Sequence, residues 1–473
     1  MPNPLFFLLL LAVAAAATAA AGEGGATRKD PCAGRRIHIR RLPPRFNAHL
    51  LRHCDAGFPL ADPSTPATSS PPCESLVNHG LGPRTHASSR SWYRTDTRLL
   101  EVFFHRRVAE RGCLVADPAL ADAVYLPYYA GLDSLPYVLD PALLDSSAQH
   151  GAELAEFLAR DRPQILARRH GHDHFLVLAG SAWDYSQPVR AAAAAAAAAE
   201  ARLWGTTSLL RLPALGNLTF LTLESRAWPW QEHAIPHPTS FHPASLPRLR
   251  AWLARARRAR RPALMLFSGG VSRPSRPNIR GSILAECANR TDACVVVDCS
   301  GGRCSHDPIR YMRPMLHARF CLQPPGDTPT RRSTFDAILA GCVPVFFEDA
   351  AARRQYGWHL PPERYDEFSV YIPKESVVFG GVKIAETLAA VGEGEVRRMR
   401  ERALEMAPRV LYRRHGSTAE LSETAKDAVD LAVDGALRRI RRRLTILCMM
   451  EGGKHQFSLG SDLFWTLGLK KWF

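Results

Sequence analysis

The sequence predicts an α/β protein of two domains, each built around a parallel β-sheet. The 473 residues suit two domains of about 200 residues each. Short apolar runs that suit buried strands alternate with segments that suit helices, and this alternation is typical of a parallel sheet covered on both faces. A proline-rich stretch at residues 234–247 predicts the hinge between the two domains.

The first expected domain covers residues 32–245. Its strands are predicted from short apolar or alternating runs bounded by turn-forming residues, at 35–40, 123–128, 174–178 and 218–223. The apolar spacing of residues 95–111 predicts a helix, whereas residues 55–91 are rich in Pro, Ser and Thr and predict a long loop. The alanine run at 191–199 predicts a helix or a linker insert.

The second expected domain covers residues 246–444 and opens with an arginine-rich helix at 248–261. Strands are then expected at 263–267, 294–298, 320–322, 343–347 and 368–372. The helices between and after them are expected at 278–288, 309–316, 333–339, 382–390, 395–406 and 418–444. Residues 445–473 fit neither pattern and are expected to form an atypical tail.

The amino terminus predicts entry into the secretory pathway. Residues 5–21 carry no charge, and the run is at the short limit for a membrane span. The small residues Ala19, Ala20 and Ala21 equally suit a signal-peptide cleavage site. Residues 1–31 are therefore expected to be a signal anchor or signal peptide followed by a short stem. The sequons at Asn217 and Asn289 agree with lumenal exposure and predict glycosylation.

The cysteines favour the same compartment. There are 11, an odd number that leaves at least one unpaired. Cys287, Cys294, Cys299 and Cys304 cluster without a C-x-x-C pair, so disulfides are favoured over a zinc site, and their pairing stays open.

The formal charge of +16 indicates an anionic partner, either nucleic acid, phosphate, an acidic polymer or a membrane surface. No nucleic-acid motif is present, so nucleic acid is not the expected partner. The chain lacks a phosphate loop, a G-x-G-x-x-G fingerprint, a G-x-S-x-G elbow, an H-E-x-x-H helix and an Asp-x-Asp triplet. A phosphate-handling enzyme on this chain would therefore neutralise charge with side chains and helix dipoles.

The most informative stretch is residues 319–345. It predicts a strand, a polar loop with Gly326, a helix that begins near Ser333, and another strand. A helix amino terminus at the carboxyl edge of a parallel sheet is an anion site, and Arg331 and Arg332 lie at that start. Asp336, one turn later, can accept hydrogen bonds from ribose hydroxyls. An ordinary capped helix with solvated arginines fits the composition equally well.

This stretch resembles the nucleotide-sugar site of the exostosin family, glycosyltransferase family 47, over roughly residues 32–440. Further matching stretches lie at residues 34–39, 42–47, 93–96, 101–105, 127–133, 171–175 and 235–239. Within this family, the wording of these motifs at the residue level is most similar to the plant xyloglucan galactosyltransferase branch. Residues 171–175 read Gly-His-Asp-His-Phe where the family often has Gly-Arg-Asp-His-Phe, which leaves Asp173 and His174 in place.

The resemblance implies two Rossmann-like domains of the GT-B type that face each other across a cleft. It implies a UDP-sugar donor held by the second domain, an acceptor glycan on the first, inversion at the anomeric carbon and no obligatory metal. The expected reaction is transfer of galactose from UDP-galactose to xylosyl side chains of xyloglucan. The alternatives are another UDP-sugar (galacturonic acid, arabinose or xylose) or a non-catalytic glycan-binding subunit. A single-pass Golgi membrane protein of type II, in complexes with other cell-wall glycosyltransferases, is the expected setting.

An inverting transfer needs one base and a site that stabilises the leaving diphosphate. The expected donor-binding residues are Gly326, Thr330, Arg331, Arg332 and Asp336, with Ser268 and Arg280 as further candidates. Asp173 with His174 is the first choice for catalysis. Asp133, Asp184 and Glu224 are the other candidates, for the base or for acceptor binding. Trp183, Trp228 and Trp230 suit stacking on sugar rings and suit core positions equally well.

Overall fold

The computed structural model describes residues 30–52, 73–86, 90–139, 149–187, 207–226, 231–271, 277–304 and 308–453. Its contacts divide the chain into two units, Met1–Gly34 and Arg35–Phe473. The described part of the first unit is a turn in which the Cys32 N–H donates to Asp30 Oδ1 at 2.8 Å. The expected membrane or signal segment, the alanine run, Trp228 and Trp230 lie outside the described residues.

The first sheet is parallel and has the strand order β1-β2-β3-β4-β5. The strands are β1 Ile37–Ile39, β2 Ala123–Tyr125, β3 His174–Val177, β4 Thr219–Thr222 and β5 Glu232–Ala234. Alternate residues face opposite sides, as the pleat requires. Val124, Leu176 and Phe220 pack against helices α6 (Ala152–Arg160) and α7 (Pro163–Ala167). On the other face, Tyr125 and Leu221 lie in one apolar core with helices α3 and α17.

The second sheet is also parallel and has the order β10-β9-β8-β6-β7. The strands are β6 Ala263–Gly269, β7 Cys294–Asp298, β8 Ala318–Gln323, β9 Val343–Phe346 and β10 Val370–Tyr371. Helices α8, α10, α11 and α15 contribute to the core on one face, and α9, α13 and α14 to the core on the other. The neighbouring strands β6 and β8 thus connect onward through helices on opposite faces. Such a switch point leaves a crevice at the carboxyl ends of the two strands.

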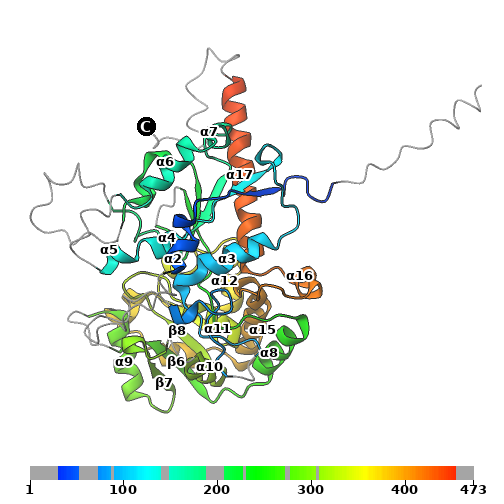
Figure 1. Ribbon diagram of the computed structural model, residues 1–473. Coiled ribbons are helices and arrows are strands. Elements are labelled where there is room, and N and C mark those ends of the chain that lie inside the picture. Colours follow the sequence, from blue (N-terminus) through cyan, green and yellow to red (C-terminus); the bar gives the residue numbers. More distant parts are fainter. Residues whose placement is uncertain are drawn as a thin grey trace, which may run out of the picture. The chain divides into compact units, whose positions relative to one another are not determined.

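The remaining helices complete the two lobes, each lobe being one sheet with the elements packed on it (Figure 1). In chain order the α-helices not yet bounded are α2 Ala48–Arg52, α3 Leu100–Ala109, α4 Ala130–Asp133, α5 Leu135–Leu139, α8 Leu246–Arg258, α9 Ile279–Asn289, α10 Pro308–His317, α11 Ser333–Ala340, α12 Tyr365–Phe368, α13 Lys374–Val378, α14 Ile384–Ala389, α15 Glu393–Val410, α16 Ala419–Thr424 and α17 Ala428–Gly453.

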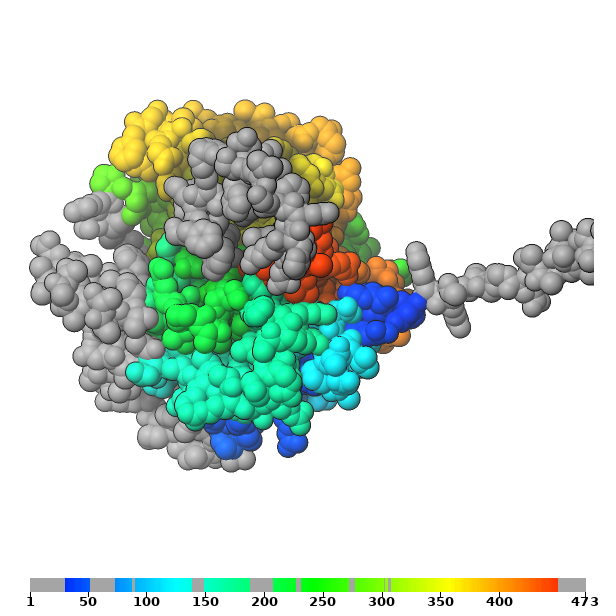
Figure 2. All heavy atoms as spheres, turned by 90° about the horizontal axis from the view of Figure 1, so that it is seen from above, coloured from blue at the N-terminus to red at the C-terminus, as the bar shows by residue number. Residues whose placement is uncertain are grey.

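The carboxyl-terminal helix differs from its sequence prediction. A single helix was expected at 418–444, but the chain breaks after α16, and α17 runs on to Gly453, into the stretch expected to be an atypical tail. Helix α17 packs on the first sheet, whose strand β4 it contacts. In the space-filling view its residues (red to orange) lie beside those of the first half of the chain (cyan to green) (Figure 2). The domain limits 32–245 and 246–444 stay a prediction.

The α/β fold with two parallel sheets is confirmed. The preference for disulfides is confirmed as well, with Cys287–Cys294, Cys299–Cys304 and Cys321–Cys342 joined and Cys448 free among the described cysteines. Of the helices that the described residues form, none is long and apolar enough to cross a lipid bilayer.

Candidate active site

The carboxyl ends of strands from the two sheets meet. After β4, the Leu223 carbonyl accepts a hydrogen bond of 3.0 Å from the Tyr356 hydroxyl. The next two residues, Glu224 and Ser225, are also hydrogen-bonded to the second lobe. In α/β proteins the carboxyl edge of a parallel sheet is where ligands bind. The junction between these two edges is therefore the place to look for an active site.

Two arginines converge at the switch point of the second sheet. Arg280 lies at the start of α9, after β6, and Arg331 lies just before α11, after β8. Arg280 Nε donates to the Pro325 carbonyl at 2.9 Å. A Cβ at Gly326 would overlap the Arg331 guanidinium and lie 2.6 Å from Arg280 Nη2. Both side chains therefore pass over Gly326, and only a residue without a side chain leaves room for them.

The charges of these arginines are poorly balanced by the protein. Neither guanidinium forms a salt bridge with a carboxylate among the described residues, although Asp327 attracts both. Burial lowers the pKa of Arg331, and the nearby positive charge of Arg280 lowers it further. Burial likewise lowers the pKa of Arg280. Two neighbouring, partly buried cations favour an anion, and a diphosphate fits their fork geometry.

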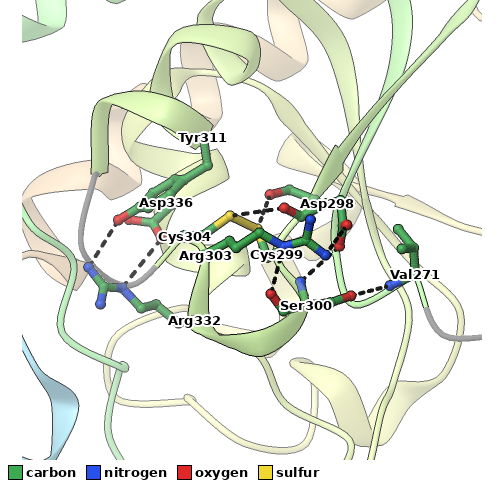
Figure 3. The surroundings of a disulfide bond; sticks show 10 residues. Val271, Asp298, Cys299, Ser300, Arg303, Cys304, Tyr311, Arg332 and Asp336 are labelled. Carbon is green, nitrogen blue, oxygen red and sulfur yellow. Dashed lines mark hydrogen bonds and ion pairs between the residues drawn. A yellow bond between two sulfur atoms is a disulfide. The ribbon is translucent and has the colours of Figure 1, made fainter. Parts of the chain in front are cut away.

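Arg332 has other partners than this pair. Its guanidinium donates to the Thr95 carbonyl at 2.9 Å. It also donates to the Tyr311 hydroxyl at 3.0 Å, and its Nε lies 3.6 Å from Asp336 Oδ2 (Figure 3). Arg332 and Asp336 line a cavity of about 160 Å³ with Ser268 and the Cys299–Cys304 disulfide. Burial raises the pKa of Asp336 to about 6, and its Oδ1 has no hydrogen-bond partner among the described residues.

The predicted donor residues thus divide into separate groups. Gly326, Arg331 and the further candidate Arg280 come together at the switch point. Arg332 and Asp336, with Ser268, form the adjacent cavity. Thr330 points instead to the first lobe, where its N–H donates to Glu224 Oε2 at 2.8 Å. Their roles in donor binding stay predictions.

The acceptor candidates Asp133, Asp184 and Glu224 follow strands β2, β3 and β4 and therefore share the carboxyl edge of the first sheet. Asp133 accepts a hydrogen bond of 2.5 Å from Tyr128. Asp184 is held by the Ser181 N–H, and burial raises its pKa, with a smaller contribution from Glu224. Beside it, the Trp183 side chain is 39% exposed. This edge thus offers a carboxylate with a raised pKa next to an accessible aromatic ring.

Asp173 and His174 lie at the opposite edge of the first sheet, where β3 begins. The Asp173 side chain is fully buried, accepts from Arg168 Nη2 at 2.8 Å and lies 2.7 Å from His174 Nδ1. Its partners hold the pKa of Asp173 below the usual range against the opposing effect of burial. Their catalytic role stays a prediction, but this position is remote from the switch point and suits a structural ion pair.

Glu101 and His237 were not among the sequence candidates. Glu101 on α3 accepts from the N–H groups of Gly131 and Ala179 at 2.8 and 2.9 Å, which join the carboxyl ends of β2 and β3, and burial raises its pKa to about 8. His237 follows β5 and contacts Thr330 Oγ1 at 3.3 Å. The available signal was that Glu101 and His237 lie in the matching stretches 101–105 and 235–239, which did not by themselves indicate a role for either side chain.

Comparison with known proteins shows that the chain is a glycosyltransferase. The family model named Exostosin GT47 domain matches residues 31–388, and the chain belongs to this family. It is 57% identical over 419 residues to "Probable xyloglucan galactosyltransferase GT19" of Arabidopsis thaliana, over 87% of this chain and 92% of that protein.

More distant relatives come from the same plant. "Xyloglucan galactosyltransferase MUR3" is 35% identical, over 88% of this chain and 64% of its own length. "Xyloglucan-specific galacturonosyltransferase 1" is 32% identical, over 88% of this chain and 59% of its own length. A solved structure titled "Crystal structure of GtfA/B complex" aligns with a TM-score of 0.32 and 9% identity over 75% of this chain and 62% of its own, a similarity too low to inform either fold or function.

Proposed function

We propose that the protein transfers galactose from UDP-galactose to xylosyl side chains of xyloglucan, with inversion at the anomeric carbon. The observation that carries the proposal is the convergence of Arg280 and Arg331 over Gly326, in the loop whose Thr330 is hydrogen-bonded to Glu224 of the first lobe. Paired cations in a loop that contacts the acidic edge of the other lobe suit a reaction in which a diphosphate leaves and a hydroxyl is deprotonated. We further propose that the two facing lobes form a GT-B arrangement, with the donor on the second lobe and the acceptor on the first.

On the donor side, the bond between the anomeric carbon and the β-phosphate oxygen breaks, and its electron pair leaves with UDP. Arg280, Arg331 and the amino terminus of α11 stabilise the negative charge that grows on the diphosphate. Asp336 accepts hydrogen bonds from the ribose. Because these cations supply the neutralisation, we propose that the reaction needs no metal and no cofactor.

On the acceptor side, a carboxylate takes the proton of the attacking hydroxyl. Asp184 is the base that the geometry favours, since burial raises its pKa and it lies at the edge that meets the donor lobe. The exposed Trp183 ring next to it suits stacking on a sugar of the acceptor. Asp133 would contact the acceptor farther along the same edge.

The choice of galactose rests on the relatives. The relative at 57% identity is named a galactosyltransferase, whereas the one named a galacturonosyltransferase is 32% identical. Galacturonic acid is therefore the second candidate sugar. We also propose that the amino-terminal segment anchors the protein in the Golgi membrane with the catalytic lobes in the lumen, because residues 5–21 carry no charge.

The test is a transfer assay on xyloglucan oligosaccharides with UDP-galactose, UDP-galacturonic acid, UDP-arabinose and UDP-xylose, each with and without a chelator. We expect product with UDP-galactose, in equal amounts with the chelator. If product forms only with a different donor, the sugar of that donor, and not galactose, is the one transferred. Strict dependence on Mn²⁺ would contradict the proposed charge neutralisation. Binding of glycan without any transfer would identify a non-catalytic subunit.

A further inference from the structure

We propose that Glu224 is a positioning residue. Through Thr330 it sets the conformation of residues 324–332, the loop between β8 and α11, which we call the donor loop. The inference rests on the proposed function, because it concerns how the first lobe controls the donor site. Glu224 directly follows β4, and only 1% of it is exposed. Its Oε2 accepts two hydrogen bonds from Thr330, from the N–H at 2.8 Å and from Oγ1.

Thr330 in turn holds the arginine that we assign to the diphosphate. The Thr330 carbonyl accepts a hydrogen bond of 2.5 Å from Arg331 Nη1. The same Nη1 donates to Thr328 Oγ1 at 3.3 Å. Glu224 holds Thr330 by its N–H and hydroxyl, and the Thr330 carbonyl holds the Arg331 guanidinium. A change at Glu224 therefore reaches the donor site through Thr330.

The surroundings strengthen this restraint. His237 Nε2 lies 3.3 Å from Thr330 Oγ1, and burial, with Arg331 and Arg332 nearby, lowers the pKa of His237 to about 3. His237 is thus neutral near pH 7, and the Glu224 carboxylate attracts the Arg331 guanidinium instead. Because the partners come from different lobes, the pair also ties the acceptor lobe to the donor loop.

Three roles for Glu224 give different kinetics. A positioning residue for the donor loop raises the donor KM when it is lost. A residue that binds the acceptor raises the acceptor KM instead. A catalytic base lowers kcat and leaves both KM values unchanged. The hydrogen bonds from Thr330 and the burial of Glu224 favour the first role.

The experiment measures both KM values and kcat for Glu224→Ala, Thr330→Val, their double variant and Thr330→Ser. We expect the donor KM to rise about tenfold in Glu224→Ala, with the acceptor KM within about twofold of the wild type. The donor KM of the double variant should be no higher than that of Glu224→Ala, because both changes break the same interaction. Thr330→Ser keeps the hydroxyl and should therefore have the donor KM of the wild type.

The matched control is Glu232→Gln. Glu232 is a buried carboxylate in β5 that pairs with Arg226, and its loss should lower stability without raising the donor KM. An unchanged donor KM in Glu224→Ala overturns the inference alone, provided that the wild type binds UDP and transfers sugar. A wild type that binds no UDP overturns the proposed function, and the inference with it.

Discussion

Arg280, in the first turn of α9, and Arg331, just before α11, follow different strands of the second sheet, yet both side chains reach the same glycine. Arg280 Nε donates to the carbonyl of Pro325, next to Gly326, and a Cβ on Gly326 would overlap the Arg331 guanidinium. The pair occupies the switch point between β6 and β8, where α/β sheets bind ligands. This relationship concentrates positive charge at the place where we propose that the diphosphate binds.

A methyl group at Gly326 should disturb this pair without unfolding the protein. Gly326→Ala forces the two guanidiniums to move, so we expect the affinity for UDP to fall about tenfold, which is ~1.4 kcal/mol. Gly392→Ala is the matched control, since a Cβ there meets nothing within 4 Å. Calorimetric titration with UDP gives the affinities, and thermal unfolding checks the fold. Equal affinities for both variants would show that the crevice does not hold the diphosphate.

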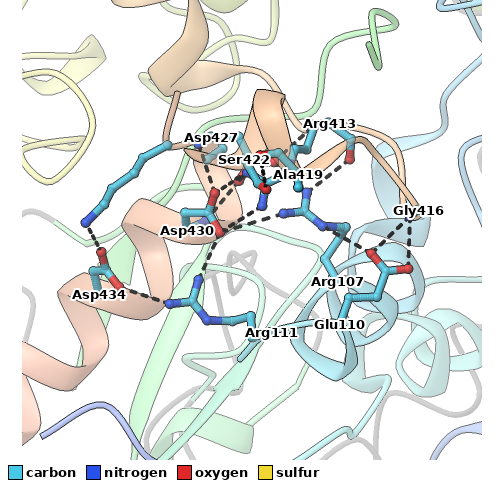
Figure 4. A network of polar contacts seen from close by, with 12 residues as sticks. Arg107, Glu110, Arg111, Arg413, Gly416, Ala419, Ser422, Asp427, Asp430 and Asp434 are labelled. Carbon is cyan, nitrogen blue, oxygen red and sulfur yellow. Dashed lines mark hydrogen bonds and ion pairs between the residues drawn. The ribbon is translucent and has the colours of Figure 1, made fainter. Parts of the chain in front are cut away.

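The buried ion network between α3 and the start of α17 should make stability depend on pH (Figure 4). Arg107 Nη1 lies 2.6 Å from Asp427 Oδ2, and Arg413 contacts the same carboxylate. Burial opposes the charge of Asp427, but Arg107 and Arg413 hold the pKa of Asp427 well below its usual range. Its contribution is therefore complete above the unfolded pKa of about 4 and is lost as the pH falls through the lower folded pKa.

We expect Asp427→Asn to destabilise the protein by about 3 kcal/mol near pH 7, because it removes one partner of a buried ion pair. The difference from the wild type should shrink below about pH 4. The control is Arg257→Ala, which removes an exposed pair with Glu401 and should cost at most about 1 kcal/mol. Denaturant unfolding between pH 3 and 7 measures both. A constant difference at every pH would refute the linkage to Asp427.

The two sequons should differ in occupancy. Asn217 is half-buried and its Nδ2 donates to the His170 carbonyl at 2.9 Å, so a glycan on Nδ2 would compete with this hydrogen bond. Asn289 is exposed at the end of α9. In a eukaryotic secretory host, Asn289→Gln should abolish the mobility shift produced by an endoglycosidase, and Asn217→Gln should leave it unchanged. The reverse pattern would contradict this assignment.

Most strands could be predicted from the sequence because they appear as apolar runs. The run at 294–298 became β7 with the same limits, although β7 is an edge strand and Val295 and Val296 are exposed. Strand β5 was missed because Glu232 and His233 are polar, and Glu232 is buried only through its pair with Arg226. The break before α17 was also missed, since the apolar spacing continues across it while Asp427 is held by Arg107.

The site was predictable only in part, because it is assembled from distant segments. The donor loop was visible in the sequence as a strand, a glycine loop and a helix start, and the structure places Gly326 and Arg331 together there. The partnership with Arg280 depends on the strand order, which local patterns do not specify. Asp173 directly precedes β3, and in a parallel sheet that position is the amino edge. The chain order therefore already contained the signal that separates Asp173 from Asp184.

The most direct test of the central claim is the affinity of UDP for Arg280→Ala and Arg331→Ala. A charge-assisted hydrogen bond contributes roughly 1.5–3 kcal/mol, so each variant should bind UDP at least about tenfold more weakly than the wild type. Arg250→Ala, at an exposed position on α8, should bind UDP as the wild type does. Unchanged affinity in both Arg280→Ala and Arg331→Ala, measured by calorimetric titration at one salt concentration, would contradict the account.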